Sequence, residues 1–326
     1  MNKVTEISPE IAGELLQIFE KHPEELTRLM NLFHHKQFCF PSAFNHIVGN
    51  FLRQLGMDPV KVTVDFRNGE CNNCHSVLDT FNEQECAILR DHLKEKVLIP
   101  DGNVYVKTTP REIQLFNEML EKRKDRPFDL VIDTLNCSYW ASDRQLVTDP
   151  ETKRIIPTNL GLKESLHEIL DKGKIFHRFH SILVVGRKHM TDWRSIELFR
   201  ERPSQVEVFL LDNSSDDDVF MLYAALQNSQ TKLISQDYMR QHEALLEPEI
   251  QRLFQKWKRC RMIRMKYKKD TRIFYPQGVD YVCQTNDHHL HIPINISEAH
   301  DKDEIHMIRW WCAALPLRES QKISNS

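Results

Sequence analysis

The chain has 326 residues, of which 40% are hydrophobic and 28% are charged, and its formal net charge is −3. This length exceeds one small core, so we expect an ordinary globular protein of two or three domains. The nearly balanced charge excludes a uniformly basic surface, so any nucleic-acid surface must be local. No apolar run is long enough to span a membrane. The N-terminus carries Glu6, Glu10 and Glu14 and no nearby arginine, unlike a secretory signal or an organellar transit peptide.

Residues 9–55 show apolar side chains at helical spacing, with Pro9, Pro23 and Pro41 at the expected helix starts. We interpret them as a short N-terminal helical segment. The pattern also fits the remnant of a helical-hairpin repeat, although no second copy follows at a fixed period.

Residues 62–124 change character. We expect a strand over 62–66, a turn that carries Cys71 and Cys74, a helix over 82–96, a strand or loop over 97–110 and a charged amphipathic helix over 110–124. The first part of this region is too small to bury much of a core, which favours a structural metal.

Residues 129–236 alternate between strand and helix patterns. The strand candidates are 130–133, 181–186, 206–211 and 232–235, and the helix candidates are 161–170, 193–200 and 218–227. Such repeated units predict an α/β domain with a parallel sheet and right-handed crossovers. We expect 141–158 to be a loop. Beyond this domain we expect a helix over 242–257, short strands over 272–275, 281–284 and 291–294, and a polar tail.

Carboxylates follow three of the predicted strands. Asp133 ends the first strand, Asp217 and Asp218 follow the strand 206–211, and Asp237 follows the strand 232–235. Because the carboxyl ends of parallel strands meet at one edge, we expect these acids to converge. Oxygen ligands suit one or two Mg²⁺ or Mn²⁺ ions, which support phosphodiester hydrolysis.

Each of these acids alone has a simpler explanation, because carboxylates commonly cap helices. Response-regulator and phosphatase-like folds also collect acids at a sheet edge. Recurrence at successive strand ends nevertheless favours a metal-dependent hydrolase or nuclease.

Cys71 and Cys74 form a CxxC motif in a turn, and this spacing lets both sulfurs reach one zinc ion. The eight unevenly placed cysteines do not indicate a disulfide framework. A redox pair is the main alternative, although this motif does not open a helix. The remaining zinc ligands stay open on this reasoning among His75, Cys86, Cys283, His288, His289, His291 and Cys312.

Eight Lys or Arg residues lie between Lys256 and Lys269, interleaved with apolar residues. One face of this basic stripe therefore packs while the other is free to meet phosphate, and Lys258 and Arg259 are candidate RNA contacts. A second basic group follows the strand 181–186 at the edge where the acids lie. Its members are Arg187, Lys188 and His189, and such contacts position nucleic acid without reading its sequence.

Nine short motifs follow one another along the chain: GECNNC, KTTPREIQLF, PFDLVIDTLN, VVGRKHM, SSDDDVFMLYAAL, ISQDYMRQH, QRLFQKW, HIPI and WWC. With them the chain resembles the protein-only ribonuclease P family, in particular its animal mitochondrial form. The resemblance implies an NYN/PIN-like metallonuclease domain over 111–269, a zinc-stabilised central domain over 61–110 and 270–318, a helical segment over 1–60 and a tail over 319–326. The helical segment is then a candidate remnant of the family's pentatricopeptide array.

The resemblance also implies an activity, namely removal of the 5′ leader of precursor tRNA with Mg²⁺ or Mn²⁺. The catalytic and metal-binding acids would be Asp133, Asp217, Asp218 and Asp237. The structural zinc ligands would be Cys71, Cys74, His291 and Cys312. Asn136 and His242 are further candidates for support of the acids or contact with RNA.

The resemblance extends to partners and compartment. It implies a tRNA methyltransferase and a short-chain dehydrogenase-like subunit as partners, and the mitochondrion as the compartment, with the nucleus or cytoplasm as alternatives. Thr134 departs from the family's usual glycine, and its β-branched side chain is expected to affect the backbone beside Asp133. Two other functions remain open: a non-catalytic tRNA-binding scaffold, and a metal-dependent endoribonuclease that acts on another RNA.

Overall fold

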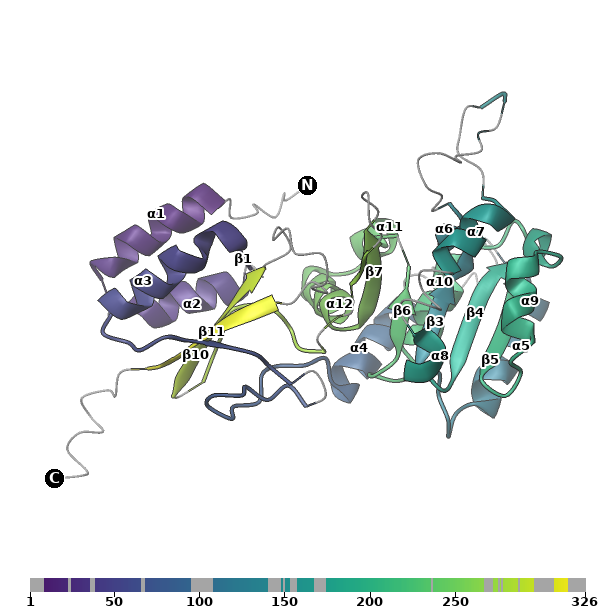
Figure 1. Ribbon diagram of the computed structural model, residues 1–326. Coiled ribbons are helices and arrows are strands. Elements are labelled where there is room, and N and C mark those ends of the chain that lie inside the picture. The colour runs from purple at the N-terminus through teal and green to yellow at the C-terminus, as the bar shows by residue number, and fades with distance from the viewer. Residues whose placement is uncertain are drawn as a thin grey trace. The chain divides into compact units, whose positions relative to one another are not determined.

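In a computed structural model, the chain divides into two compact units, which we describe separately (Figure 1). The first unit is Met1–Thr80 with Gln277–Ser326, and the second is Phe81–Pro276. The structure describes residues 9–22, 25–35, 39–65, 68–94, 108–139, 148, 150–152, 157–166, 174–235, 237–266, 272–274, 276, 278–286, 288–295 and 308–315. None of the helices in these ranges is long and apolar enough to cross a membrane. The expected loop at 141–158 and segment at 97–110 lie mostly outside these ranges, and the expected tail lies wholly outside them.

The first unit packs three helices on one face of a five-stranded sheet (Figure 1). The strand order is β1-β10-β11-β2, and β9 also pairs with β10. Only the β1–β10 pair is parallel in this sheet. The bounds are α1 Pro9–Glu20, α2 Leu26–His35, β1 Phe40–Pro41, η2 Ser42–Phe44, α3 Asn45–Gln54, β2 Val60–Val62, β9 Gln284–Thr285, β10 His289–Asn295 and β11 Ile308–Ala314.

Alternating side chains give this sheet two different faces. Trp311 and Ala313 of β11 join the core formed with the three helices. Trp310 and Cys312, which point the opposite way, join a small cluster with Cys71. This second cluster therefore contains two of the predicted zinc ligands, Cys71 and Cys312.

The second unit contains a six-stranded sheet in the order β5-β4-β3-β6-β7-β8. All neighbours are parallel except β7 and β8, which confirms the predicted parallel α/β sheet. The strands are β3 Leu130–Asp133, β4 Ile182–Arg187, β5 Val206–Leu211, β6 Lys232–Ile234, β7 Met262–Lys266 and β8 Arg272–Phe274. The helices are α4 Glu83–Leu93, α5 Pro110–Lys122, α6 Thr134–Ser138, α7 Asn159–Leu166, α8 Ile175–Arg178, η6 Lys188–Met190, α9 Arg194–Arg200, α10 Asp217–Ala225, α11 Arg240–Ala244 and α12 Pro248–Arg261.

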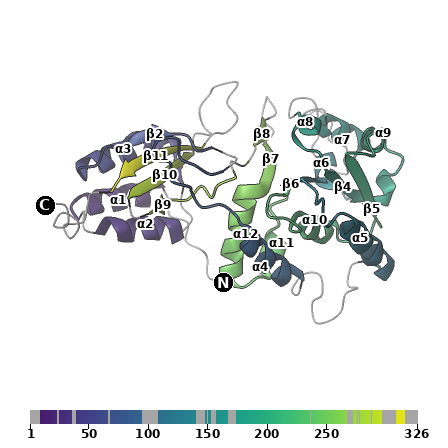
Figure 2. The same ribbon diagram turned by 90° about the horizontal axis from the view of Figure 1, so that it is seen from below.

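Helices cover both faces of this sheet (Figure 2). Val131 of β3 belongs to the core shared with α4, α5, α10 and α12. Leu130 and Ile132 point the other way, into the core shared with α7, α8 and α9. Burial on both faces explains why these strands are continuous apolar runs rather than alternating patterns.

Several predicted boundaries differ from the structure. The expected strand at 62–66 lies earlier, as β2. The expected helix over 242–257 is two helices, because Pro248 occupies the first turn of α12 and starts it anew. The basic stripe does not form one element: residues 256–261 are the last residues of α12, and residues 262–266 form β7. Strand β11 was not predicted.

Two elements lie in a different unit from the one expected. Helix α4 and strand β8 were predicted to belong to the zinc-binding region, but both fall within the second unit. Cys86 and Leu89 of α4 are fully buried in that unit's core, and β8 extends its sheet through β7. The separation of the first unit into a helical segment and a central domain stays a prediction.

Thr134 fits beside Asp133 without a strained backbone, since its φ is not positive. It is fully buried, and its Oγ1 donates a hydrogen bond to the carbonyl oxygen of Val185, 2.6 Å away. Space for this side chain comes from the neighbouring strand, where a Cβ added to Gly186 would lie 2.5 Å from Oγ1 of Thr134. The side chain of Thr134 therefore occupies space that depends on the absence of a side chain at Gly186.

We therefore expect Gly186→Ala to lower the free energy of unfolding by about 1–3 kcal/mol, because it overpacks a buried site. Combining it with Thr134→Ala should recover much of the loss, since the clashing atom is removed. A double-mutant cycle from chemical denaturation measures this coupling. Strictly additive losses would contradict the packing described here.

Candidate active site

The four acids predicted from the sequence meet at the carboxyl edge of the second unit's sheet. Asp133 is the last residue of β3, and Asp217 and Asp218 lie in the first turn of α10, which follows β5. Asp237 follows β6 and is linked to Asp133 through Ser235, whose hydroxyl donates to Oδ2 of Asp133 (2.7 Å) and accepts from the Asp237 N–H (3.0 Å). The strand ends thus gather these side chains as the topology requires.

Asp133 is fully buried and held by its neighbours. The backbone N–H of Asn136 donates to Oδ1 (2.9 Å), and the side-chain amide of Asn136 donates to Oδ2 (2.6 Å). Asp133 therefore does cap α6, so the simpler explanation of this acid also applies. Burial raises the pKa of Asp133 to about 7. The hydrogen bonds from Ser235 and from the Asn136 backbone oppose this shift, and the charges of Asp217 and Asp218 add to it.

Asp217 is nearly buried and forms an ion pair with Arg187, with 2.7 Å between Nη2 and Oδ1. Burial raises the pKa of Asp217 above its usual range, although Arg187 opposes this effect. Arg187 also donates to the carbonyl oxygen of Asn213, 3.1 Å away. The predicted RNA contact Arg187 is thus placed among the acids.

His242 lies beside Asp218, with 3.5 Å between Nε2 and Oδ2. Asp216, Asp218 and His242 offer ligand atoms that all lie within 4.8 Å of one another. Burial lowers the pKa of His242, but Asp218, Asp216 and Asp237 outweigh it and raise the pKa above its ordinary value. Asp216 is the N-cap residue of α10, and its side chain makes no capping hydrogen bond to that helix.

The other basic candidates divide into two groups. Lys188 and His189 are exposed and hold the loop after β5: Lys188 pairs with Asp212, and the His189 N–H donates to Oδ1 of Asn213 (3.0 Å). Lys258 is 4% exposed and pairs with Glu243 (2.6 Å), so its amino group has a structural role inside the second unit. Arg259 is half-buried on the same helix, and its role in RNA contact stays a prediction.

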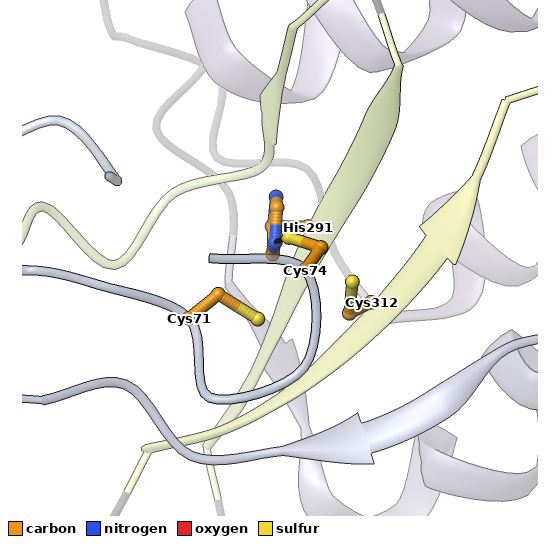
Figure 3. A group of neighbouring side chains, drawn as sticks. All are labelled: Cys71, Cys74, His291 and Cys312. Carbon is orange, nitrogen blue, oxygen red and sulfur yellow. Dashed lines mark hydrogen bonds between the residues drawn. The ribbon is translucent and has the colours of Figure 1, made fainter. Parts of the chain in front are cut away.

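The first unit holds the second candidate site, where Cys71, Cys74, His291 and Cys312 bring their ligand atoms within 4.8 Å of one another (Figure 3). His291 and Cys312 are directly opposite in the β10–β11 pair, so both point to the same face. The turn after β2 brings Cys71 and Cys74 over that face, and Sγ of Cys74 lies 3.3 Å from Nε2 of His291.

The chemistry of this group suits a soft divalent cation. Three thiols and one imidazole form the donor set. Burial and the neighbouring His289 lower the pKa of His291 to about 4, which keeps the imidazole neutral, as a ligand must be. Of the other candidates, Cys86 lies in the second unit and Cys283 in the helix-facing core of the first.

Residues that the sequence analysis missed are those that hold the acids. Ser235 links Asp133 to Asp237, and Glu112 of α5 contacts the loop after β5. Ser235 had a weak signal, as a hydroxyl two residues before a strand-end acid. Glu112 had a clearer sequence signal, because Thr109 and Glu112 form the T-x-x-E pattern of a capping box, which predicts the start of a helix.

A parallel sheet covered by helices on both faces, with acids converging at its carboxyl edge, fits an NYN/PIN-like α/β domain, here accompanied by a Cys/His site. The family model described as "Protein-only RNase P" matches residues 66–312. The chain belongs to the protein-only ribonuclease P family.

Individual relatives agree with this assignment. The chain is 30% identical over 238 residues to the mitochondrial ribonuclease P catalytic subunit of Rattus norvegicus, and 29% identical over 238 residues to that of Mus musculus. Each match covers 70% of this chain but only 37% of the relative. The crystal structure of nuclear proteinaceous RNase P 2 from A. thaliana shares the fold, with a TM-score of 0.51 at 18% identity over 94% of this chain and 68% of that one.

Proposed function

We propose that this chain carries a ribonuclease P activity: an endoribonuclease that removes the 5′ leader of precursor tRNA by metal-dependent phosphodiester hydrolysis. The observation that supports it best is the convergence of Asp133, Asp217, Asp218 and Asp237 within a chain of this family. Hydrolysis would leave a 5′ phosphate on the tRNA and a 3′ hydroxyl on the leader.

The acids fit one or two Mg²⁺ or Mn²⁺ ions. They are hard oxygen donors. Burial raises the pKa of Asp133 and of Asp217 by disfavouring their charged forms, and a bound cation would offset this effect. Asp133, Asp217, Asp218 and Asp237 would hold the cation, with Asp216 and His242 beside them. A divalent cation bound there supplies acidification of water and stabilisation of a departing oxygen.

The chain's own groups orient these acids. The Asn136 backbone N–H donates to Oδ1 of Asp133, and the Asn136 amide and the Ser235 hydroxyl donate to Oδ2. The backbone N–H of Met239 donates to Oδ1 of Asp237 (2.7 Å). Arg187 pairs with Asp217 and opposes the effect of burial on the pKa of that carboxyl. Lys188 and His189, exposed beside the acids, are the proposed contacts to tRNA phosphates.

We propose Zn²⁺ for the site formed by Cys71, Cys74, His291 and Cys312, where it would join the turn after β2 to strands β10 and β11. This role is architectural. Partner subunits, a tRNA methyltransferase and a short-chain dehydrogenase-like protein, are also proposed. The rodent relatives are named as mitochondrial subunits, which supports the mitochondrion as the compartment.

The test is cleavage of a 5′-labelled precursor tRNA with Mg²⁺, alone and with the proposed partners, with Asp217→Asn as the control. We expect a single cut at the mature 5′ end, lost in the control. Scattered cuts would favour an endoribonuclease with another RNA substrate. Tight tRNA binding without cleavage under every condition would favour a scaffold.

A further inference from the structure

Glu112, in the first turn of α5, lies outside the acidic cluster but contacts the loop that delivers it. The side chain is 6% exposed. Oε1 accepts a hydrogen bond from the backbone N–H of Asp212, and Oε2 accepts one from Oγ of Ser215 (2.7 Å). Oε2 also accepts from the N–H of Thr109 (3.3 Å), which completes a capping box. One carboxylate thus joins the start of a helix to a loop about one hundred residues further along the chain.

The contacted loop, residues 212–216, runs from the end of β5 to α10, whose first two residues are Asp217 and Asp218. Its other side is held by the segment after β4, through Lys188 to Asp212 and the His189 N–H to Asn213. Glu112 supplies the hold from α5. Movement of this loop would move both acids, because they follow it directly.

Glu112 is more buried and accepts more hydrogen bonds than a helix cap requires. A capping glutamate satisfies a backbone N–H at the end of a helix and is ordinarily a surface group. Here burial alone would raise the pKa of Glu112, but hydrogen bonds from the Asp212 backbone, Ser215 and the two preceding threonines lower it below its usual range. The buried group is therefore an ionised carboxylate, and hydrogen bonds to an ionised acceptor are about twice as strong as neutral ones.

We propose that Glu112 is a positioning residue for the acidic cluster: it fixes the loop 212–216 so that Asp217 and Asp218 are held ready to bind a divalent cation. This inference rests on the proposed function, since it names a residue that supports the same site. Glu112 acts through the loop and does not touch the reacting atoms.

The experiment compares Glu112→Gln with a matched control, Glu207→Gln. Both glutamates tie α5 to β5 or its loop, but Glu207 pairs with Arg123 at the other end of α5 (3.1 Å), away from the acids. Mn²⁺ affinity is measured by titration calorimetry, with Asp217→Asn as the baseline, and thermal unfolding confirms that each variant is folded at the assay temperature. We expect Glu112→Gln to weaken Mn²⁺ binding about tenfold or more, the range seen for groups that orient metal ligands. Glu207→Gln should bind as the wild type does.

Two further readouts separate positioning from general stability. Hydrogen exchange of the 212–216 amides should be faster in Glu112→Gln than in Glu207→Gln. The Mg²⁺ concentration for half-maximal cleavage should rise by the same factor as the Mn²⁺ dissociation constant, and excess Mg²⁺ should restore the rate. A purely structural loss would not be recovered by added metal.

Equal Mn²⁺ affinity of Glu112→Gln and wild type would overturn the inference, as would an equal loss in Glu207→Gln. If Glu112→Gln fails to fold, Ser215→Ala tests the same contact from the loop side. This variant removes one hydrogen bond to Glu112 and should also weaken Mn²⁺ binding. A wild type that binds Mn²⁺ but cuts no RNA contradicts the proposed function, while the titrations still decide the role of Glu112. A wild type that binds no Mn²⁺ would overturn both.

Discussion

Replacing Asp133 with asparagine is expected to abolish RNA cleavage while leaving the second unit at least as stable as before. The lost carboxylate would lower the cleavage rate by a factor on the order of 10³, comparable to removal of other preorganised electrostatic groups. Stability should rise by about 1–2 kcal/mol, within the range of single stabilising substitutions at strained functional sites. Precursor tRNA cleavage is measured with Mg²⁺, and thermal unfolding is measured at pH 8 in Mg²⁺-free buffer.

The physical reason is that the fold accepts the amide better than the charge. Asparagine can keep its oxygen toward the Asn136 N–H and turn its NH₂ toward Ser235 and the side-chain oxygen of Asn136, once that amide is flipped. The repulsion from Asp217 and Asp218 disappears, together with the burial of a charge that raises the pKa of Asp133 to about 7. At pH 8 this penalty is present in the wild type.

Asp129, which directly precedes the same strand, β3, provides a control. It accepts hydrogen bonds from the backbone N–H groups of His180 (2.8 Å) and Ser181 (3.0 Å). Asp129→Asn keeps an oxygen for these bonds and should leave cleavage unchanged. Undiminished cleavage by Asp133→Asn, or its unfolding, would contradict the assignment of Asp133.

Loss of one zinc ligand is expected to unfold the first unit and spare the second. Cys312→Ser should reduce zinc content from one equivalent to none and destabilise the first unit by several kcal/mol, because binding of a structural zinc contributes ~10–16 kcal/mol to folding in small domains. The supporting cluster around the site is small, with Val62, Leu78 and Trp310 at its centre. Mass spectrometry of metal content and hydrogen exchange by region measure both effects.

The second unit provides an internal reference, since its two cores contain no residue of the Cys/His site. Its exchange protection should persist in Cys312→Ser. Cys39→Ser is the matched control, because Cys39 is half-buried in the first unit and outside the site. Full zinc content in Cys312→Ser, or a wild type that is stable without zinc, would argue against the structural role.

Much of the second unit could be predicted because its strands are unusual in composition. The strands at 130–133 and 206–211 are apolar runs with β-branched residues, and the structure has them with the same bounds. Once the parallel sheet is inferred, the shared direction of its strands places Asp133, Asp217, Asp218 and Asp237 at one edge. The position of the acids was therefore predicted from the ends of parallel strands, and the resemblance to the family implied their catalytic role.

Other features depend on contacts that spacing does not encode. Helix α12 ends at Arg261 and strand β7 begins at the next residue, Met262. No glycine or proline marks this boundary, so the change from helix to strand within the basic stripe could not be predicted. From the residues alone, His291 could not be chosen over His289, because that choice depends on the register that sets His291 opposite Cys312. Lys258 was assigned to RNA because the sequence does not reveal its buried partner, Glu243.

The first unit combines two segments, Met1–Thr80 and Gln277–Ser326, that are synthesised at different times. Cys74 and His291 are 217 residues apart in sequence. At a synthesis rate of about 5–20 residues per second, the first two thiols leave the ribosome roughly 10–40 s before the imidazole that joins them. The intervening second unit can fold in that interval, whereas the half-formed cysteine pair must wait, open to oxidation or to the wrong metal, until β10 and β11 are made.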